Sequence, residues 1–384
     1  MSFAHGVNAT IPQIPMKIST STRAIVLRNA FAPGRLLAAC AALITLACGQ
    51  QVPDDTRIAV DHYRLTGVEA ADLAKPDAHR ALVQLSHEPC NRDAMGALSY
   101  RLDEAGYRRE SANSLTQFVK TCGRADGFLS AAAEDLMAVS DYGAAVTVAN
   151  QLLANEPAEP DYYFARGRAY EGQGDHERAL ADYMQTIALI PERSTITSNL
   201  FLRAADMHAK AGRYCDAVSM IRMWMSADPE RADNSQAKNI IASYSGKQSC
   251  PSTYASGKDS FARPSGNTIR VVAKINGVTG TFIVDTGATY VTLTDAFAHR
   301  ARIDTAHAQK VRLQTANGPA TGLLTQATSV SVGQVQAADV PVSVDTKSGA
   351  TLGKSVDGLL GQSFLSRFET AFTPTHWSIG KSAG

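Results

Sequence analysis

The chain has 384 residues, which is enough for two domains and a leader. Its formal net charge of +1 excludes the basic footprint of a nucleic-acid-binding protein, so no nucleic-acid partner is expected. Hydrophobic residues make up 45% and charged residues 19%, proportions typical of a soluble globular protein.

The first 48 residues are predicted to be an export leader. Residues 1–35 carry basic but no acidic side chains, and an almost wholly apolar run from Leu36 to Cys48 follows. A basic start with an apolar run too short to span a membrane is typical of a secretory signal. The end of the run resembles a bacterial lipoprotein signal, although Thr45 replaces the usual leucine. The resemblance implies lipidation of Cys48, a membrane tether and a periplasmic location. Plain cleavage nearby and an uncleaved anchor are the alternatives.

Cysteine usage agrees with export. Two of the six cysteines, Cys40 and Cys48, belong to the leader. The other four are Cys90, Cys122, Cys215 and Cys250. An even number in an exported chain indicates two disulfides, and sequence proximity favours Cys90–Cys122 and Cys215–Cys250. Buried free thiols are the alternative. No Cys/His spacing indicates zinc, and neither a metal nor another cofactor is expected.

A helical region is predicted to follow the leader. Residues 49–80 have a polar, mixed composition that predicts a linker, and residues 81–247 carry a helical pattern. The pattern is clearest at Tyr163, Gly167, Tyr170, Ala179, Tyr183 and Pro191. This spacing resembles a tetratricopeptide repeat, in which small residues let two helices pack closely.

The same frame recurs on both sides of this segment. Ala145 lies 34 residues before Ala179 (179 − 145), and Ala217 lies 38 residues after it (217 − 179). The downstream repeat therefore contains an insertion of four residues. Because one repeat cannot bury its own apolar face, three or four stacked repeats are expected. The resemblance implies a surface that binds a peptide or a partner protein; a helical spacer without a ligand is the alternative.

The last part of the chain is predicted to be an all-β barrel. Residues 248–266, rich in Pro, Ser and Gly, predict a hinge. From 267 to 382, short β-rich runs alternate with turn signals. Strands are expected near 268–275, 280–285, 289–293, 310–316, 319–325, 327–332, 335–344 and 376–379, with helices at 295–302 and 362–368.

One predicted strand ends in Asp285-Thr286-Gly287-Ala288, a turn that leaves a carboxylate at its tip. Aspartic peptidases need one carboxylate to take a proton from water, and a second, protonated carboxyl to donate one to the scissile carbonyl. Two such groups about 3 Å apart cannot both ionise, so they share one proton. Gly287 lets backbone pass close to the site, and Thr286 can hydrogen-bond the turn. An inert turn of a barrel is the alternative.

Two later segments complete a family pattern. Ala316, Asn317 and Gly318 stand between two β-like runs, and Leu359-Leu360-Gly361 precedes a short helix. Together with the Asp-Thr-Gly turn, these segments resemble the retropepsin-like aspartic proteases, in particular their bacterial single-domain relatives. The resemblance covers roughly residues 267–380. It implies that Ala316, Asn317 and Gly318 form a substrate-binding flap, and that Leu359, Leu360 and Gly361 pack behind the active loop.

The second carboxylate is expected from another copy of the chain. Asp304 and Asp345 are each followed by Thr but lack the glycine, and Asp357 stands where the family has no catalytic acid. The resemblance therefore implies a homodimer in which Asp285 and its symmetry mate form the site. Thr286 would join the two loops across the dimer, and Gly287 and Ala288 would approach the substrate backbone.

Three functions compete on this sequence. The leading interpretation is an exported aspartic endopeptidase that acts on proteins or peptides, with repeats that recruit the substrate or a partner. The alternative is a non-catalytic scaffold that uses the protease fold for dimerisation. An intact Asp-Thr-Gly favours the first. A cytosolic retropepsin-like protein is disfavoured by the leader.

Overall fold

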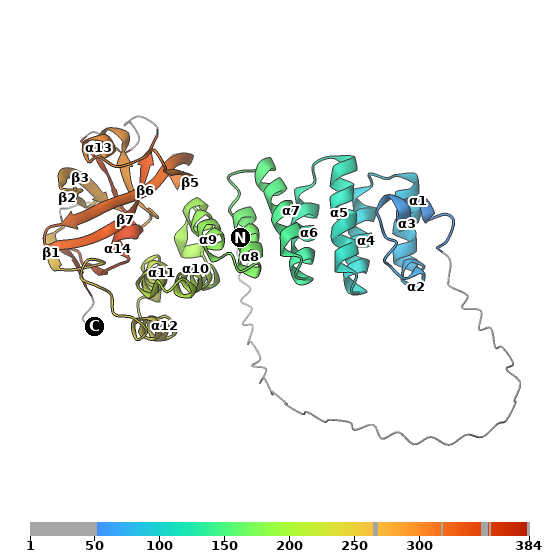
Figure 1. Cartoon of the computed structure of the whole chain (residues 1–384), viewed down its shortest axis with the longest axis horizontal. Helices are drawn as coiled ribbons and strands as arrows, with labels where there is room; N and C mark the ends of the chain where they lie inside the picture. Colours follow the sequence, from blue (N-terminus) through green and yellow to red (C-terminus); the bar gives the residue numbers. More distant parts are fainter. Residues whose placement is uncertain (1–51, 264–267, 316–317, 347–351, 353–354, 382–384) are drawn as a thin grey trace, which may run out of the picture. The chain divides into compact units, whose positions relative to one another are not determined.

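A helical region and a β region follow one another along the chain (Figure 1). The structure is a computed structural model, and it describes residues 52–263, 268–315, 318–346, 352 and 355–381. The predicted leader with Cys48 and the predicted flap residues Ala316 and Asn317 lie outside the described residues. None of the described helices is both long and apolar enough to cross a membrane.

The helical region extends from Arg57 to Ser245. Its elements are α1 (Arg57–His62), α2 (Ala70–Leu73), α3 (Pro76–His87), α4 (Arg92–Glu104), α5 (Arg108–Cys122), α6 (Asp126–Ala138), α7 (Tyr142–Asn155), α8 (Pro160–Gly172), α9 (His176–Leu189), η1 (Arg193–Thr195), α10 (Ser198–Lys210), α11 (Tyr214–Ser226), η2 (Pro229–Arg231) and α12 (Ser235–Ser245). From α3 onward, each α-helix packs against the next one in the chain. This stacking confirms the predicted helical-repeat fold.

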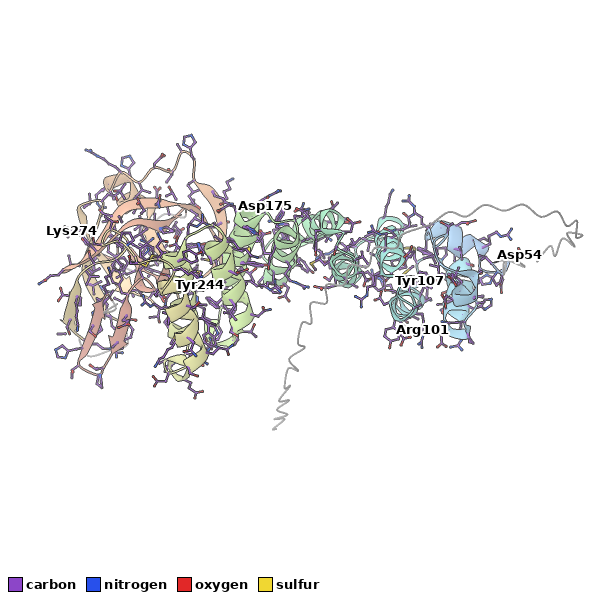
Figure 2. The ribbon with its side chains drawn as sticks, turned by 60° about the horizontal axis from the view of Figure 1, so that its bottom comes forward. Asp54, Arg101, Tyr107, Asp175, Tyr244 and Lys274 are labelled. Carbon is purple, nitrogen blue, oxygen red and sulfur yellow. A yellow bond between two sulfur atoms is a disulfide. The ribbon has the colours of Figure 1, made fainter. Side chains whose placement is uncertain are left out.

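Local sequence explains how α8 and α9 form one closely packed pair. A Cβ atom at Gly167 on α8 would lie 2.7 Å from the ring of Tyr183 on α9, so only glycine allows this approach. Gly174, at the turn between the helices, has a φ of +77°, which suits glycine. Asp175, labelled in Figure 2, then caps α9 by accepting a hydrogen bond of 3.1 Å from the amide of Arg178.

The start of the helical region differs from the prediction. Helices α1 and α2 and the beginning of α3 lie within residues 49–80, where composition predicted a linker. Tyr63, Leu65 and Leu73 in this segment are buried in the same core as α3 to α7. The composition of the segment is polar because few of its side chains face the core and the rest face water, as is usual for an end repeat.

Disulfides join Cys90 to Cys122 and Cys215 to Cys250, the pairs that sequence proximity favoured.

The β region forms a barrel and a small separate sheet. Its elements are β1 (Lys258–Ala262), β2 (Arg270–Ile275), β3 (Val278–Val284), β4 (Val291–Thr294), α13 (Asp295–Arg300), β5 (Gln309–Thr315), β6 (Gly318–Val332), β7 (Val335–Asp345), β8 (Gly358–Leu360), α14 (Gln362–Leu365), β9 (Glu369–Phe372) and β10 (His376–Gly380). The barrel sheet has the order β2-β3-β8-β4-β7-β6-β5, and a β2–β6 pairing closes it. The other sheet has the order β1-β10-β9. The predicted all-β barrel is confirmed.

Individual strands differ from the expectation in two ways. The two strands expected at 319–325 and 327–332 are one continuous strand, β6, because Gln326 still pairs with Pro341 on β7. Strands β1, β8 and β9 were not predicted. Each is five residues or shorter and is defined by its partner strand, so its own sequence carries little alternation.

Candidate active site

Asp285 follows β3 at the point where this strand pairs in parallel with β8. Its amide N–H donates to the carbonyl of Leu360 over 3.1 Å, so the backbone of the turn is tied to β8. The carboxylate is half-buried, and its Oδ1 accepts hydrogen bonds from the amides of Gly287 (2.8 Å) and Ala288 (3.2 Å). These two amide donors hold the carboxylate through one of its two oxygens.

The segment Leu359-Leu360-Gly361 lies directly behind this turn. Ile283 and Val284 pair with Leu359 and Leu360. A Cβ atom at Gly361 would lie 2.1 Å from the carbonyl oxygen of Tyr290 and 2.8 Å from that of Ala288. A side chain at this position would push the loop outward. Glycine is therefore required by close backbone approach.

Helix α14 holds the other side of the loop. The amide of Gln362 donates to the carbonyl of Ala288 (2.9 Å), and its side-chain Nε2 donates to the carbonyl of Thr286 (3.0 Å). The same Nε2 lies 2.9 Å from Oγ of Ser226, a residue of α11. Residues 285–290, the candidate active-site loop (below, the active-site loop), are thus connected through one buried glutamine to the helical region.

Arg193 is a second connection, and the sequence analysis did not single it out. It lies in η1 and is buried, with 6% of its surface exposed. Its guanidinium donates to the carbonyl of Thr286 over 3.3 Å and to Oγ1 of Thr289. Burial lowers the pKa of Arg193 to about 10, and the negative charge of the Asp285 carboxylate opposes this shift. Arg193 is therefore still a cation at neutral pH, next to the active-site loop.

The other candidate carboxylates in the barrel have structural contacts. Asp357 accepts hydrogen bonds from the amide of Thr281 (2.9 Å) and from the guanidinium of Arg300 (2.6 Å). Asp304 accepts one from the amide of Ala306 (2.9 Å). Within the described ranges, no group of three or more His, Cys, Asp or Glu side chains is arranged to hold a metal ion.

The hairpin of β5 and β6 carries the predicted flap. Thr315 pairs with Gly318 across its end, and Gly318 has a φ of +96°, which favours glycine. The free edge of β5 meets the side chain of Gln185 from α9. Gln185 donates to the carbonyl of Arg312 (2.6 Å) and accepts from its amide (3.0 Å), as a neighbouring strand would. The helical region therefore covers part of the outer edge of this hairpin.

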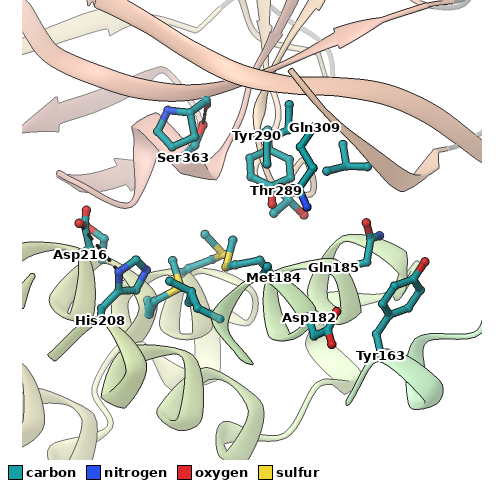
Figure 3. A pocket seen from close by; sticks show the side chains of 18 of the residues that line it. Tyr163, Asp182, Met184, Gln185, His208, Asp216, Thr289, Tyr290, Gln309 and Ser363 are labelled. Carbon is teal, nitrogen blue, oxygen red and sulfur yellow. Dashed lines mark hydrogen bonds and ion pairs between the residues drawn. The ribbon is translucent and has the colours of Figure 1, made fainter. Parts of the chain in front are cut away.

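A cavity of about 710 Å³ lies between helices α8 to α11 and the barrel (Figure 3). Its helical side includes the apolar side chains of Leu180, Met184, Met220 and Met223. Its barrel side includes Thr289 and Tyr290, together with parts of β5 and β6. Asp285 itself does not line the cavity. Thr289 and Tyr290 follow it by only four and five residues, so the cavity begins beside the active-site loop.

Arg166, which lines the cavity, forms an ion pair between two repeat helices. Its guanidinium makes two hydrogen bonds of 2.8 Å to the carboxylate of Asp182, which is buried. This bidentate pair joins α8 to α9.

Comparison with known proteins agrees with the two regions. Residues 271–367 match the family model described as "gag-polyprotein putative aspartyl protease". No curated protein matches the chain. A retropepsin-like aspartic protease from Rickettsia conorii is 22% identical, with a TM-score of 0.27, over 33% of this chain and 90% of that one.

Solved helical-repeat proteins match the first region. MamA residues 41 to the end, from Desulfovibrio magneticus RS-1, is 18% identical, with a TM-score of 0.36, over 48% of this chain and 100% of that one. TTC0263, a TPR protein from Thermus thermophilus, is 19% identical, with a TM-score of 0.32, over 48% of this chain and 97% of that one.

The helical region has a fold like that of tetratricopeptide repeats, and the β region contains the residues that match the aspartyl protease family model. The Asp-Thr-Gly turn lies inside the matched residues 271–367.

Proposed function

We propose that the protein is an aspartic endopeptidase whose active site is formed by Asp285 from two copies of the chain. The observation that carries the proposal is the geometry of this carboxylate. It stands at a strand end, is held through Oδ1 by two amides, and is braced from behind by a glycine that leaves no space. A carboxylate fixed in this way is suited to bind and orient a water molecule.

The proposed chemistry requires two carboxyl groups and one water. Asp285 of one copy, ionised, takes a proton from the water. Asp285 of the other copy, protonated, donates to the carbonyl oxygen of the scissile peptide bond. The water attacks the carbonyl carbon directly, so no covalent intermediate with the enzyme forms. The C–N bond then breaks, and the carboxyl group that took the proton of the water passes it to the leaving amine. Thr286 joins the two loops, while Gly287 and Ala288 contact the substrate backbone.

The chemistry of the other aspartates supports a second copy as the source of the second carboxyl. Asp357 is held by Arg300 and by the amide of Thr281, and Asp304 by a turn amide. A two-fold dimer would bring two identical turns together, which is the commonest symmetry of soluble oligomers. We propose that Ala316, Asn317 and Gly318 act as a flap that covers the bound peptide, and that the peptide binds as an added strand.

We further propose that the repeats help to recruit the substrate. The cavity of about 710 Å³ that begins beside Thr289 and Tyr290 supports this idea, because its opposite side consists of repeat residues. Met184, Met220 and Met223 offer an adaptable apolar surface, which is suited to side chains of varied shape. A protein or peptide bound at the loop would extend into this cavity.

Export is part of the proposal. The two disulfides require an oxidising compartment to form and persist. Together with the basic and apolar leader, they support a periplasmic protein, tethered to the membrane if Cys48 is lipidated.

Peptide-library cleavage by the full chain, followed by mass spectrometry, tests this function. Cleavage by the wild type that disappears in Asp285→Ala and is blocked by pepstatin is the expected result. No cleavage by a protein shown to be dimeric, at any pH between about 3 and 8, would contradict the proposal. The repeats would then be the functional part, in a non-catalytic scaffold.

A further inference from the structure

We propose that Arg193, supplied by the helical region, is a positioning residue of the aspartic site that orients the Thr286–Gly287 peptide toward the Asp285 carboxylate. The proposal rests on the proposed peptidase function and adds a second role for the repeats. They would complete the active site as well as recruit the substrate.

The first observation is the place of Arg193 in the repeat. Four residues, 156–159, connect α7 to α8, whereas eight, 190–197, connect α9 to α10. The difference of four residues (8 − 4) accounts for the insertion found in the sequence. The longer connection contains η1, which begins at Arg193. The extra residues extend the connection as far as the active-site loop. Arg231 of η2 supports this extension by donating to the carbonyl of Ser194.

The second observation is the unusual environment of the charge. Arg193 has 6% of its surface exposed, yet it forms no ion pair within 4.0 Å among the described residues. Its hydrogen bonds go to a backbone carbonyl and to a threonine hydroxyl. Burying a cation without a carboxylate partner at contact distance is costly, because the cation loses its hydration. A role in binding the loop explains why this cation is kept there.

The third observation links Arg193 to Asp285 through one peptide unit. The carbonyl of Thr286 and the amide of Gly287 belong to the same planar trans peptide and point in opposite directions. Arg193 and Gln362 both donate to this carbonyl, and the amide donates to Oδ1 of Asp285 over 2.8 Å. Holding the carbonyl therefore aims the amide at the carboxylate. The nearby positive charge also polarises the peptide and strengthens the amide as a donor.

The test uses the full chain with Arg193→Met, Arg193→Gln and Arg193→Lys. Arg193→Met is expected to lower kcat about ten- to hundredfold with little change in KM, because the reacting group is displaced and not the peptide contacts. Arg193→Lys keeps a charged donor and is expected to restore part of kcat. Arg193→Gln keeps a neutral donor on a shorter side chain and is expected to lower kcat as well.

Arg222→Met is the matched control. Arg222 is also an arginine of the helical region that reaches the barrel, and burial also lowers its pKa. It donates to the carbonyl of Arg367 (3.3 Å) and not to the active-site loop. This variant is expected to keep the wild-type kcat. An identical loss of kcat in Arg222→Met would overturn the proposal, because docking of the two regions would then be the whole effect.

Hydrogen exchange at the Gly287 amide tests the positioning role of Arg193 without relying on cleavage. Faster exchange in Arg193→Gln than in the wild type and Arg222→Met is expected, with unchanged protection around Trp377 as evidence of folding. Equal exchange in all three would refute the positioning role. A wild type without Asp285-dependent cleavage would refute the proposed function alone, and the exchange comparison would still decide the role of Arg193.

Discussion

The close approach behind the active-site loop makes Gly361→Ala an informative substitution. Gly361 has a φ of −98° and a ψ of −172°, an extended conformation that any residue can adopt, so the change carries no backbone strain. The added Cβ would lie 2.1 Å from the Tyr290 carbonyl oxygen, where an ordinary contact needs at least 3.4 Å. The loop must therefore move by more than 1 Å (3.4 − 2.1 = 1.3). Overpacking of this kind costs about 3 kcal/mol, near the upper end of the usual range.

Urea unfolding measures this cost in the barrel alone. The chain has two tryptophans, and in a Trp224→Phe background the buried Trp377 reports on the barrel. Gly361→Ala should lower the free energy of unfolding by about 3 kcal/mol and abolish Asp285-dependent cleavage. Gly96→Ala on α4 is the matched control. Its Cβ would lie 3.9 Å from the ring of Phe128, an ordinary contact, so the unfolding transition that Trp377 reports should not be weakened. An unchanged unfolding midpoint for Gly361→Ala would refute the steric argument.

Three further predictions concern the helical region. Removing one partner of the buried Arg166–Asp182 pair should lower the free energy of unfolding by about 3 kcal/mol. The double variant Arg166→Met/Asp182→Leu should lower it by less than the sum of the two single changes, and a double-mutant cycle in thermal unfolding measures the difference. Replacing Cys90 and Cys122 by serine opens a loop with a sequence separation of 32, and should lower the free energy of unfolding by about 4 kcal/mol in denaturant titration. Burial lowers the pKa of His208 from 6.5 to about 4. As the pH falls, the unfolded chain binds a proton at His208 before the folded chain does. The stability that depends on neutral His208 is therefore complete above pH 6.5 and is lost as the pH falls toward 4. His208→Gln should reduce that loss by about 3 kcal/mol, and equal pH dependence in the two proteins would contradict the assignment.

Sequence reasoning could place the Asp-Thr-Gly turn at the end of a strand because its signals are local. A β-branched run that ends in Asp285-Thr286-Gly287, and a later Leu-Leu-Gly, are each readable within about ten residues. The structure places both segments side by side, with Val284 paired to Leu360. The repeat frame was readable for a similar reason, since Gly167 and Tyr183 meet at a spacing fixed by helix geometry.

Contacts between the two regions could not be predicted. Arg193 lies 93 residues from Thr286, and Gln185 lies 127 residues from Arg312. Nothing in either local sequence specifies the partner. The only signal was the insertion of four residues, which indicated an unusual connection without indicating what it contacts. Likewise, β8 is three residues long and became a strand only because β3 and β4 flank it.

Mixing wild-type and Asp285→Asn chains tests the central claim most directly. The two proteins are co-refolded at equal amounts and constant total concentration, and cleavage of one substrate peptide is measured. If each site needs Asp285 from two copies, only wild-type pairs are active, and about a quarter of the wild-type rate remains. If one chain acts alone, about half remains, and that result would contradict the shared site.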